Sequence, residues 1–345
     1  MKKRAFQVIL TLLLSAAALY VALRGISFAD VGEALAQVDW GGMIIALVLI
    51  LGTLVIRAQR WRVLLGRTVS LPDAFGLIGI GYLISGVLPL RAGDPARAVG
   101  ASLRGPISAL AALSTVVVER VLDMLLVVIV LVATLPFVPG LQDYLAAGQA
   151  DQFLSFNLLL ILSGVLAFGL LLAFILVAVF PTTTEMLALR LLLALRIRNT
   201  DRWLKPLRSI LHGLTALRSP KDGLAIGLWS IALWGTTGAY FAIIMWACRA
   251  FLPAVSLLRS LVAMWASAFG MVFPAQGGIG AFHFAVRTAL FWGFDVAEEL
   301  GFAYAVVVHA LPYLAGITLG ALTLLFWGMS VKSLINRGEH IEVES

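Results

Sequence analysis

The chain has 345 residues, of which 61% are hydrophobic and only 12% are charged, with a formal net charge of +7. Its mean hydropathy of +1.01 excludes a soluble fold and indicates an all-α polytopic membrane protein. Basic residues beside apolar helices follow from membrane topology, so the charge gives no reason to expect nucleic-acid binding. The single cysteine, Cys248, excludes an intrachain disulfide and a cysteine-based zinc site, and we expect neither a metal nor a cofactor.

The N-terminal stretch has a basic start, Met1 to Arg4, followed by the apolar run Ala5–Leu23. That run is longer than a usual signal core and no clear cleavage site follows, which predicts a retained signal anchor. Crossing a bilayer takes about 20 helical residues. On that basis we predict six full spans, at about 5–23, 40–56, 121–138, 157–180, 223–247 and 300–329.

Two further apolar stretches, 74–118 and 260–294, contain arms too short to cross the bilayer. An arm of about 12–15 residues reaches roughly 18–22 Å, which is about half a membrane. We therefore predict two re-entrant broken hairpins. Their expected arms are Ala74–Leu88 and Ile107–Val118 around a charged loop, and Leu261–Phe273 and Ile279–Gly293 around Pro274 to Gly278.

An even number of crossings puts both termini, and most basic side chains, in the cytoplasm, as the positive-inside bias requires. We therefore expect a multi-pass protein of the cell (inner) membrane. A shift of 185 residues places Pro89 on Pro274 and Gly93 on Gly278. Within a single transmembrane domain, 1–345, we predict a first repeat at 41–135 and a second at 226–329, arranged as an inverted repeat whose broken segments converge on a site near the midplane.

A basic segment, 181–221, lies between these repeats and is predicted to be cytoplasmic and amphipathic. Its apolar stripe comprises Trp203, Leu207, Ile210, Leu214 and Leu217. Such a helix can lie at the interface against anionic headgroups. A linker helix packed under the bundle fits the same pattern.

The first candidate site is a basic cluster at the first hairpin. Arg91, Asp94 and Arg97 recur at three-residue spacing and would share one helix face. Guanidinium groups bind phosphate with a fixed fork geometry, and a lipid phosphate is the obvious anion in a bilayer. Snorkelling of a cytoplasmic loop to the headgroups is the alternative.

Glu119 and Asp123 would also share a helix face, which is unfavourable for like charges without a cation nearby. Arg120 can pair with Asp123, which leaves Glu119 to find Arg91, Arg97 or a proton. A network that holds the hairpin to the next span and a role in proton or ion coupling both remain open.

The tip of the second hairpin supplies a candidate outer half of the site. Gln276, Gly277 and Gly278 form a tight break that could present backbone N–H groups to an anion at a helix start, or could serve close helix packing. His283 and His309 flank the tip as candidates for contact with substrate or protons. A lone histidine on an apolar helix is nevertheless more often a hydrogen-bonded core residue.

Several motifs in this order resemble the transmembrane lysylphosphatidylglycerol synthase/flippase-like family, whose best-known members are the multiple peptide resistance factors. They are Arg57-x-x-Arg60-Trp-x-x-Leu64, Gly81-Tyr82, Leu88-Pro-x-Arg91-x-Gly93-Asp94-x-x-Arg97, Glu119-Arg-Val-Leu-Asp123 and Phe273-Pro-x-x-Gly277-Gly-Ile-Gly. The resemblance implies a lipid-translocating membrane domain, which moves aminoacylated phosphatidylglycerol in those factors and is linked to isoprenoid-linked sugars in other members. His283 and His309 depart from the family pattern, where an acidic residue and an arginine are expected.

We therefore expect a lipid flippase that moves an anionic or phosphate-bearing lipid, either a phospholipid or a polyprenyl phosphate, with Arg91 and Arg97 binding the phosphate. The alternatives are a membrane-embedded glycosyl- or aminoacyl-type transferase, with Asp94 or Glu119 as its base, and a non-catalytic partner of such an enzyme. The large factors carry a soluble aminoacyl-transferase domain after the membrane part. This chain ends at Ser345 without one, so we expect that it does not aminoacylate lipid by itself. A homodimer and a complex with a lipid-modifying enzyme are both compatible with the sequence.

Overall fold

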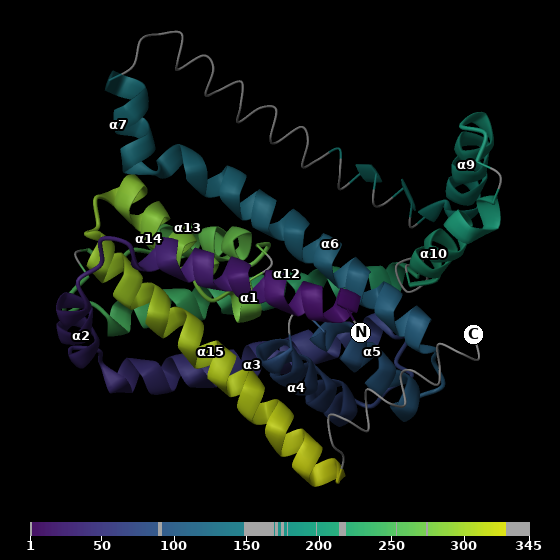
Figure 1. Ribbon diagram of the computed structural model, residues 1–345, viewed down its shortest axis with the longest axis horizontal. Helices are drawn as coiled ribbons and strands as arrows, with labels where there is room; N and C mark the ends of the chain where they lie inside the picture. Colours follow the sequence, from purple (N-terminus) through teal and green to yellow (C-terminus); the bar gives the residue numbers. More distant parts are fainter. Residues whose placement is uncertain are drawn as a thin grey trace.

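The computed structural model describes residues 2–88, 92–147, 169, 172–173, 176–177, 179–197, 199–213, 219–252, 254–273 and 275–328. Throughout these residues the regular structure is helical, with no strand (Figure 1). Within the described residues, three helices are long and apolar enough to cross a membrane, and a fourth span results if one bent pair of helices is counted as one span. The chain is therefore an all-helical polytopic membrane protein, as its composition predicts. Most of the predicted span at 157–180 lies outside the described residues.

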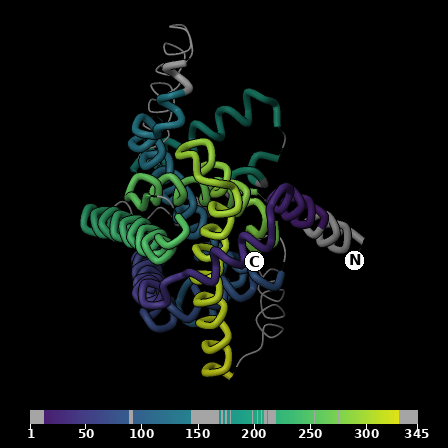
Figure 2. Tube along the Cα trace, turned by 90° about the vertical axis from the view of Figure 1, so that its left-hand side faces the viewer, coloured from purple at the N-terminus to yellow at the C-terminus, as the bar shows by residue number. Residues whose placement is uncertain are grey.

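The N-terminal stretch that was predicted to be an anchor forms helix α1 (Lys2–Leu23). After Gly25, which has a left-handed φ of +79°, the chain continues in α2 (Phe28–Ala36), and the axes of the two helices differ by 81°. The Ser27 hydroxyl accepts a hydrogen bond from Asp30 N and begins α2. Figure 2 shows α1, in purple, on one side of the bundle.

Two long helices, α3 (Trp40–Leu64) and α12 (Pro220–Ala247), pack antiparallel along their length (Figure 1). At one end Asp39 N donates to the Ala247 carbonyl at 2.9 Å. At the other end Arg67 and Asp222 form an ion pair at 2.7 Å. The pair is therefore fixed in register at both ends.

The first helical hairpin consists of α4 (Leu71–Val87) and α5 (Gly93–Arg104). An ion pair of 3.4 Å between Arg104 and Asp73 joins the open end of the hairpin. Near its tip Gly93 lies directly against the Gly81 carbonyl, where any Cβ would collide with that oxygen.

This arrangement corrects the predicted arms of the first hairpin. The charged stretch expected to be a loop is helix α5, and 107–118, expected to be the second arm, begins the long helix α6 (Ala109–Thr134). The predicted span at 121–138 therefore starts at 109 and ends before the short 3-10 helix η1 (Leu135–Phe137). The reason is that the charges of α5 find partners on α6 and do not need water.

The second hairpin, α13 (Leu257–Gly270) and α14 (Ala281–Phe294), has arms close to those predicted. Its open end is closed by the Arg259 guanidinium, 5.1 Å from the centre of the Phe294 ring. The tip contains the short 3-10 helix η2 (Gln276–Gly278), in which Gly277 and Gly278 have φ of +57° and +75°. Only glycine takes such angles at no steric cost, so this tip depends on its glycines.

Helix α15 (Glu298–Trp327), in yellow in Figure 2, crosses the bundle. It packs antiparallel on α4. Gly79 and Gly320 bring the two backbones together, as small residues do between membrane helices. The remaining helices are α7 (Pro139–Ala147), α9 (Pro181–Ala194) and α10 (Thr200–Gly213).

Helix α10 contains the part of the predicted amphipathic stripe that the structure describes. It packs on α6 with Leu204 and Leu211 buried, whereas the Trp203 side chain is 61% exposed. The buried face thus runs through Leu204 and Leu211 and not through Trp203, because α6 offers an apolar partner on that side. This packing corresponds to the linker-helix alternative; Leu214 and Leu217 lie outside the described residues.

Candidate functional site

A buried ion network lies where α3, α5 and α6 meet. Nη1 of Arg60 donates to Oδ1 of Asp123 at 2.7 Å, and Nη2 of Arg60 donates to Oε1 of Glu119 at 3.3 Å. Nη2 of Arg97 donates to the other carboxylate oxygen of Glu119 at 2.6 Å. Glu119 therefore bridges two arginines, one from α3 and one from α5.

Helical spacing explains how these side chains meet. Glu119 and Asp123 lie one turn apart on α6, and Arg57 and Arg60 lie three residues apart on α3, so each pair points to one side of its helix. Two carboxylates on one helix face repel each other. Here α3 and α5 place guanidinium groups between and beside them, which offsets that repulsion.

Two further pairs extend the network. Nη2 of Arg120 donates to both carboxylate oxygens of Asp94 at 2.8 Å, and Arg57 lies 3.6 Å from Asp123. The predicted pairing of Arg120 with Asp123 is therefore wrong, because Asp123 already binds Arg60 and because α5 brings Asp94 to Arg120. The shared face of Asp94 and Arg97 is confirmed by their 3.4 Å contact.

Aromatic and hydroxyl groups complete the surroundings of the network. Nε1 of Trp234 donates to Oδ1 of Asp123 at 3.2 Å, and Arg60 donates to the Ser230 hydroxyl at 3.3 Å, so α12 also takes part. The Arg97 guanidinium lies 4.7 Å from the centre of the Trp61 ring, a cation–π distance. Buried charges need partners of this kind, because an unpaired charge in a low-dielectric interior is costly.

Accessibility divides the network into two parts. The side chains of Arg60, Arg97 and Glu119 are sealed, with 0%, 4% and 1% exposed. Those of Arg57 and Arg120 are 19% and 44% exposed. A ligand that approaches this network would therefore contact Arg57 and Arg120 first.

The structure brings together five of the site residues predicted from the sequence, namely Asp94, Arg97, Glu119, Arg120 and Asp123. Arg91 lies outside the described residues. Sequence reasoning missed Arg57 and Arg60 as site residues, because arginines at the end of an apolar helix are what the positive-inside bias produces. Their three-residue spacing, which puts both on one helix face, was the available indication.

The tip of the second hairpin contacts the first hairpin and α1. Nε2 of Gln276 donates to the Gly86 carbonyl at 3.0 Å, and its backbone N–H donates to the Ser15 hydroxyl at 2.6 Å. The tips of the two hairpins therefore meet. The N–H groups of Gly278 and Ile279 donate to carbonyls of the tip itself, so a role of Gln276, Gly277 and Gly278 in anion binding stays a prediction.

His283 and His309 lie together in an aromatic cluster behind this tip. Their ring centres are 5.0 Å apart, and Phe282 stacks on His309 at 4.4 Å. A ring nitrogen, Nε2, of His309 hydrogen bonds to the Gly277 carbonyl at 3.1 Å, and Nδ1 of His283 accepts from Gly280 N at 3.4 Å. In these positions both histidines stabilise the tip, and their contact with a substrate stays a prediction.

A separate cavity of about 730 Å³ lies between the end of α1, α14 and the start of α15. Arg24, Arg287, Glu298 and Glu299 are its charged lining residues. Arg287 donates to the Arg24 and Val21 carbonyls at 3.4 and 3.3 Å and pairs with Glu298 at 2.9 Å, so it anchors the end of α1. Among the described residues no group of histidines, cysteines and carboxylates could hold a metal ion.

The helices and the buried ion network define a polytopic membrane protein with an ionised polar site inside its helical bundle. The chain belongs to the lysylphosphatidylglycerol synthase transmembrane-region family, whose model matches residues 8–320. That match covers nearly the whole chain and identifies a membrane domain related to lipid handling. No curated protein and no solved structure matches the chain.

Proposed function

We propose that this protein is a flippase, which moves an anionic or phosphate-bearing lipid across the bilayer. The observation that carries the proposal is the buried ion network of Arg57, Arg60, Arg97, Glu119 and Asp123. Ionisable groups are rare inside membrane bundles and usually mark the path of a substrate or ion. Because the chain belongs to a family related to lipid handling, we infer that the substrate on this path is a lipid.

The arrangement of the helices supports an inverted repeat. Each half contains a long helix, two short helices that form a hairpin and a second long helix. Corresponding helices of the two halves also make corresponding contacts. Helix α4 of the first half packs on α15 of the second half, and α13 of the second half packs on α6 of the first half. The equivalent helices α3 and α12 run antiparallel, as inverted repeats require. In transporters such repeats rock against each other around a site between them.

The proposed topology keeps six spans in the cell (inner) membrane, with both termini in the cytoplasm. Basic side chains gather at one end of the bundle, where Arg67 pairs with Asp222 and Arg104 pairs with Asp73. The opposite end carries Asp39, Asp295 and Glu298 together with fewer basic side chains, among them Arg249 and Arg287. This asymmetry follows the positive-inside bias if the first end faces the cytoplasm.

The substrate classes that fit are phospholipids and polyprenyl phosphates, because both carry a phosphate that a guanidinium can bind. The transferase alternative is less well supported. Asp94 is held by Arg120 and Glu119 by Arg97, so neither carboxylate can take a proton without first breaking an ion pair. Incubation with a donor would reveal a transferase as a shift in lipid mass.

The test of the transport proposal is leaflet exchange in liposomes that contain the purified protein and a labelled anionic lipid. We expect exchange above that of empty liposomes, and we expect Arg91→Ala to abolish it. Arg249→Gln is the matched control, because Arg249 binds Asp39 at an exposed end of α12. If every lipid tried, including polyprenyl phosphates, exchanges no faster than in empty liposomes, the proposal fails.

A further inference from the structure

The arginines of the ion network are not equivalent. Nη1 of Arg60 donates to Asp123 and Ser230, and its Nη2 donates to Glu119. Arg97 binds Glu119 and stacks on Trp61. Both side chains are nearly inaccessible, so these two arginines hold helices together and have no surface to offer a ligand.

Arg57 is left with unused hydrogen-bonding capacity. Within the part of the chain that the structure describes, its guanidinium donates no hydrogen bond, and its one ion contact, to Asp123, is 3.6 Å long. An arginine has five N–H donors. The side chain is nevertheless mostly enclosed, so this capacity is directed into the bundle and not to bulk water.

Arg120 has a similar free side. Its Nε and Nη2 atoms bind Asp94, whereas Nη1 donates no hydrogen bond to any described residue. Arg57 contacts Asp123, which lies three residues after Arg120 on α6, so the two guanidinium groups approach the same part of the network. Asp94 pairs with Arg120, but Asp123 is shared between Arg57 and Arg60, so one further anion would stabilise these buried positive charges.

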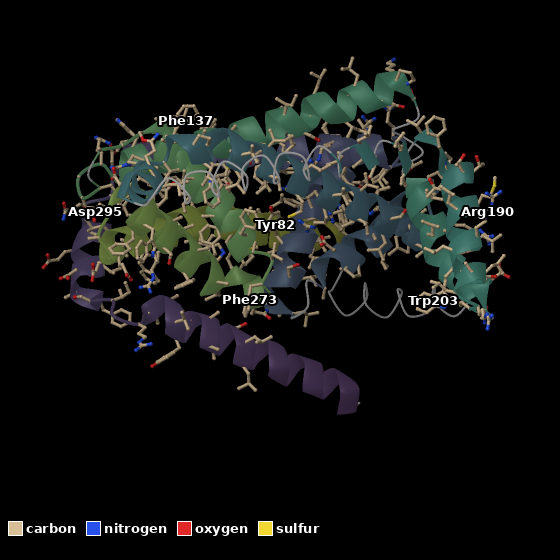
Figure 3. The ribbon with its side chains drawn as sticks, turned by 90° about the horizontal axis from the view of Figure 1, so that it is seen from above. Tyr82, Phe137, Arg190, Trp203, Phe273 and Asp295 are labelled. Atoms are coloured by element: carbon tan, nitrogen blue, oxygen red, sulfur yellow. The ribbon has the colours of Figure 1, made fainter. Side chains whose placement is uncertain are left out.

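The charge balance points the same way. Among the described residues the network contains four guanidinium groups, from Arg57, Arg60, Arg97 and Arg120, and three carboxylates. Tyr82 lies on α4 next to Gly81, and Gly81 faces the Arg97 side chain of the network. Figure 3 places Tyr82 near the middle of the length of the molecule, between Asp295 at one end and Arg190 at the other.

We propose that Arg57 and Arg120 together bind the phosphate group of the transported lipid, while Arg60 and Arg97 keep the helices in place. This inference rests on the proposed function and assigns the substrate contact to a residue, Arg57, that sequence reasoning left out. The recognised chemistry is one phosphate, bound between two guanidinium forks. Asp94 competes for one of those forks, because it already occupies two donors of Arg120.

The test is binding of a short-chain phosphatidic acid to the purified full chain in detergent, measured by calorimetry. We expect Arg57→Gln and Arg120→Gln each to weaken binding about tenfold or more, because a charge-assisted hydrogen bond is lost. Asp94→Asn should tighten binding, because it releases Arg120. Arg104→Gln is the matched control, since Arg104 binds Asp73 and stacks on Trp327 at the other end of the hairpin.

Thermal unfolding of each variant shows whether it is folded, and Arg57→Lys keeps the charge at that position if Arg57→Gln does not fold. Wild-type affinity in both glutamine variants, or in Arg57→Lys and Arg120→Gln, would overturn the inference. Equal binding of inorganic phosphate would identify a phosphate-ion site and not a lipid site, which would also overturn it. If leaflet exchange is absent but binding still depends on Arg57 and Arg120, the transport proposal fails and this inference stands.

Discussion

Nη1 of Arg60 lies 2.7 Å from Oδ1 of Asp123, although 63 residues separate the two in the chain. The Arg60 side chain has no exposed surface, and Asp123 also receives a hydrogen bond from Trp234 on α12. This contact therefore joins α3, α6 and α12 at one point. The stability of the packed helices should therefore depend on the pairing of these buried charges.

Replacing Arg60 by glutamine should strongly destabilise the protein. The change leaves Asp123 and part of Glu119 buried with too little positive charge, and losing one partner of a buried ion pair costs about 3–5 kcal/mol. The free energy of unfolding in detergent is the measurement. Arg249→Gln, which removes an exposed pair with Asp39, should change the free energy of unfolding far less, because surface ion pairs contribute little. Equal losses in both variants would contradict the assigned role of Arg60.

Arg97 and Glu119 should be energetically coupled. They lie 2.6 Å apart and both are buried, so removing the second partner after the first should cost far less than removing either alone. A double-mutant cycle with Arg97→Gln and Glu119→Gln should give a coupling energy of about 1.5–3 kcal/mol. Additive losses would mean that the two side chains do not depend on each other.

Gly93→Ala should open the tip of the first hairpin. An added Cβ at this position collides with the Gly81 carbonyl, and such overpacking typically costs about 1–3 kcal/mol. Gly235→Ala on α12 is the matched control, because nothing lies within 4 Å of the added Cβ. The control should be neutral or stabilise by up to about 1 kcal/mol. Unfolding curves that place both variants on the same side of wild type would contradict the observed contact.

His309→Phe should loosen the tip of the second hairpin. The variant keeps an aromatic ring against Phe282 but loses the 3.1 Å hydrogen bond to the Gly277 carbonyl. Hydrogen exchange of the backbone amides at 276–280 should become faster, while exchange in α12 stays unchanged. His309→Gln retains an N–H donor and should recover part of the protection. Unchanged exchange in His309→Phe would show that the hydrogen bond does not hold the tip.

Asp39 should make stability depend on pH only under acidic conditions. The Arg249 guanidinium, 2.8 Å away, holds the pKa of the Asp39 carboxyl below its ordinary value of 3.8. A lowered pKa in the folded state adds stability above that ordinary value, and this contribution disappears as the pH falls through the folded pKa. Unfolding measured from pH 6 downward should therefore show a loss below about pH 4 that is smaller in Asp39→Asn.

The candidate site in the structure contains residues that the sequence indicated and two arginines that were not selected from it. Asp94, Arg97, Glu119, Arg120 and Asp123 could be selected from the sequence, because charged residues are conspicuous in an apolar chain. Arg57 and Arg60 were not selected, because arginines at the end of a membrane helix are expected from topology alone, although their three-residue spacing was an indication. Their role became visible only when α3 was placed beside α6.

The amino-acid sequence by itself determined that the chain is a helical membrane protein, where the helices α1, α3, α12 and α15 lie, and that the second hairpin breaks at its glycines. Hydrophobicity and backbone preference are local properties, so they can be read along the chain. Which arginine pairs with which carboxylate was decided by the tertiary structure. Spacing along α6 predicted that Arg120 pairs with Asp123. Because α3 and α5 pack on α6, Asp123 pairs with Arg60 and Arg120 pairs with Asp94. Buried charges take the partners that the packed helices bring within reach, and a nearby residue in the sequence has no priority when another guanidinium lies closer in space.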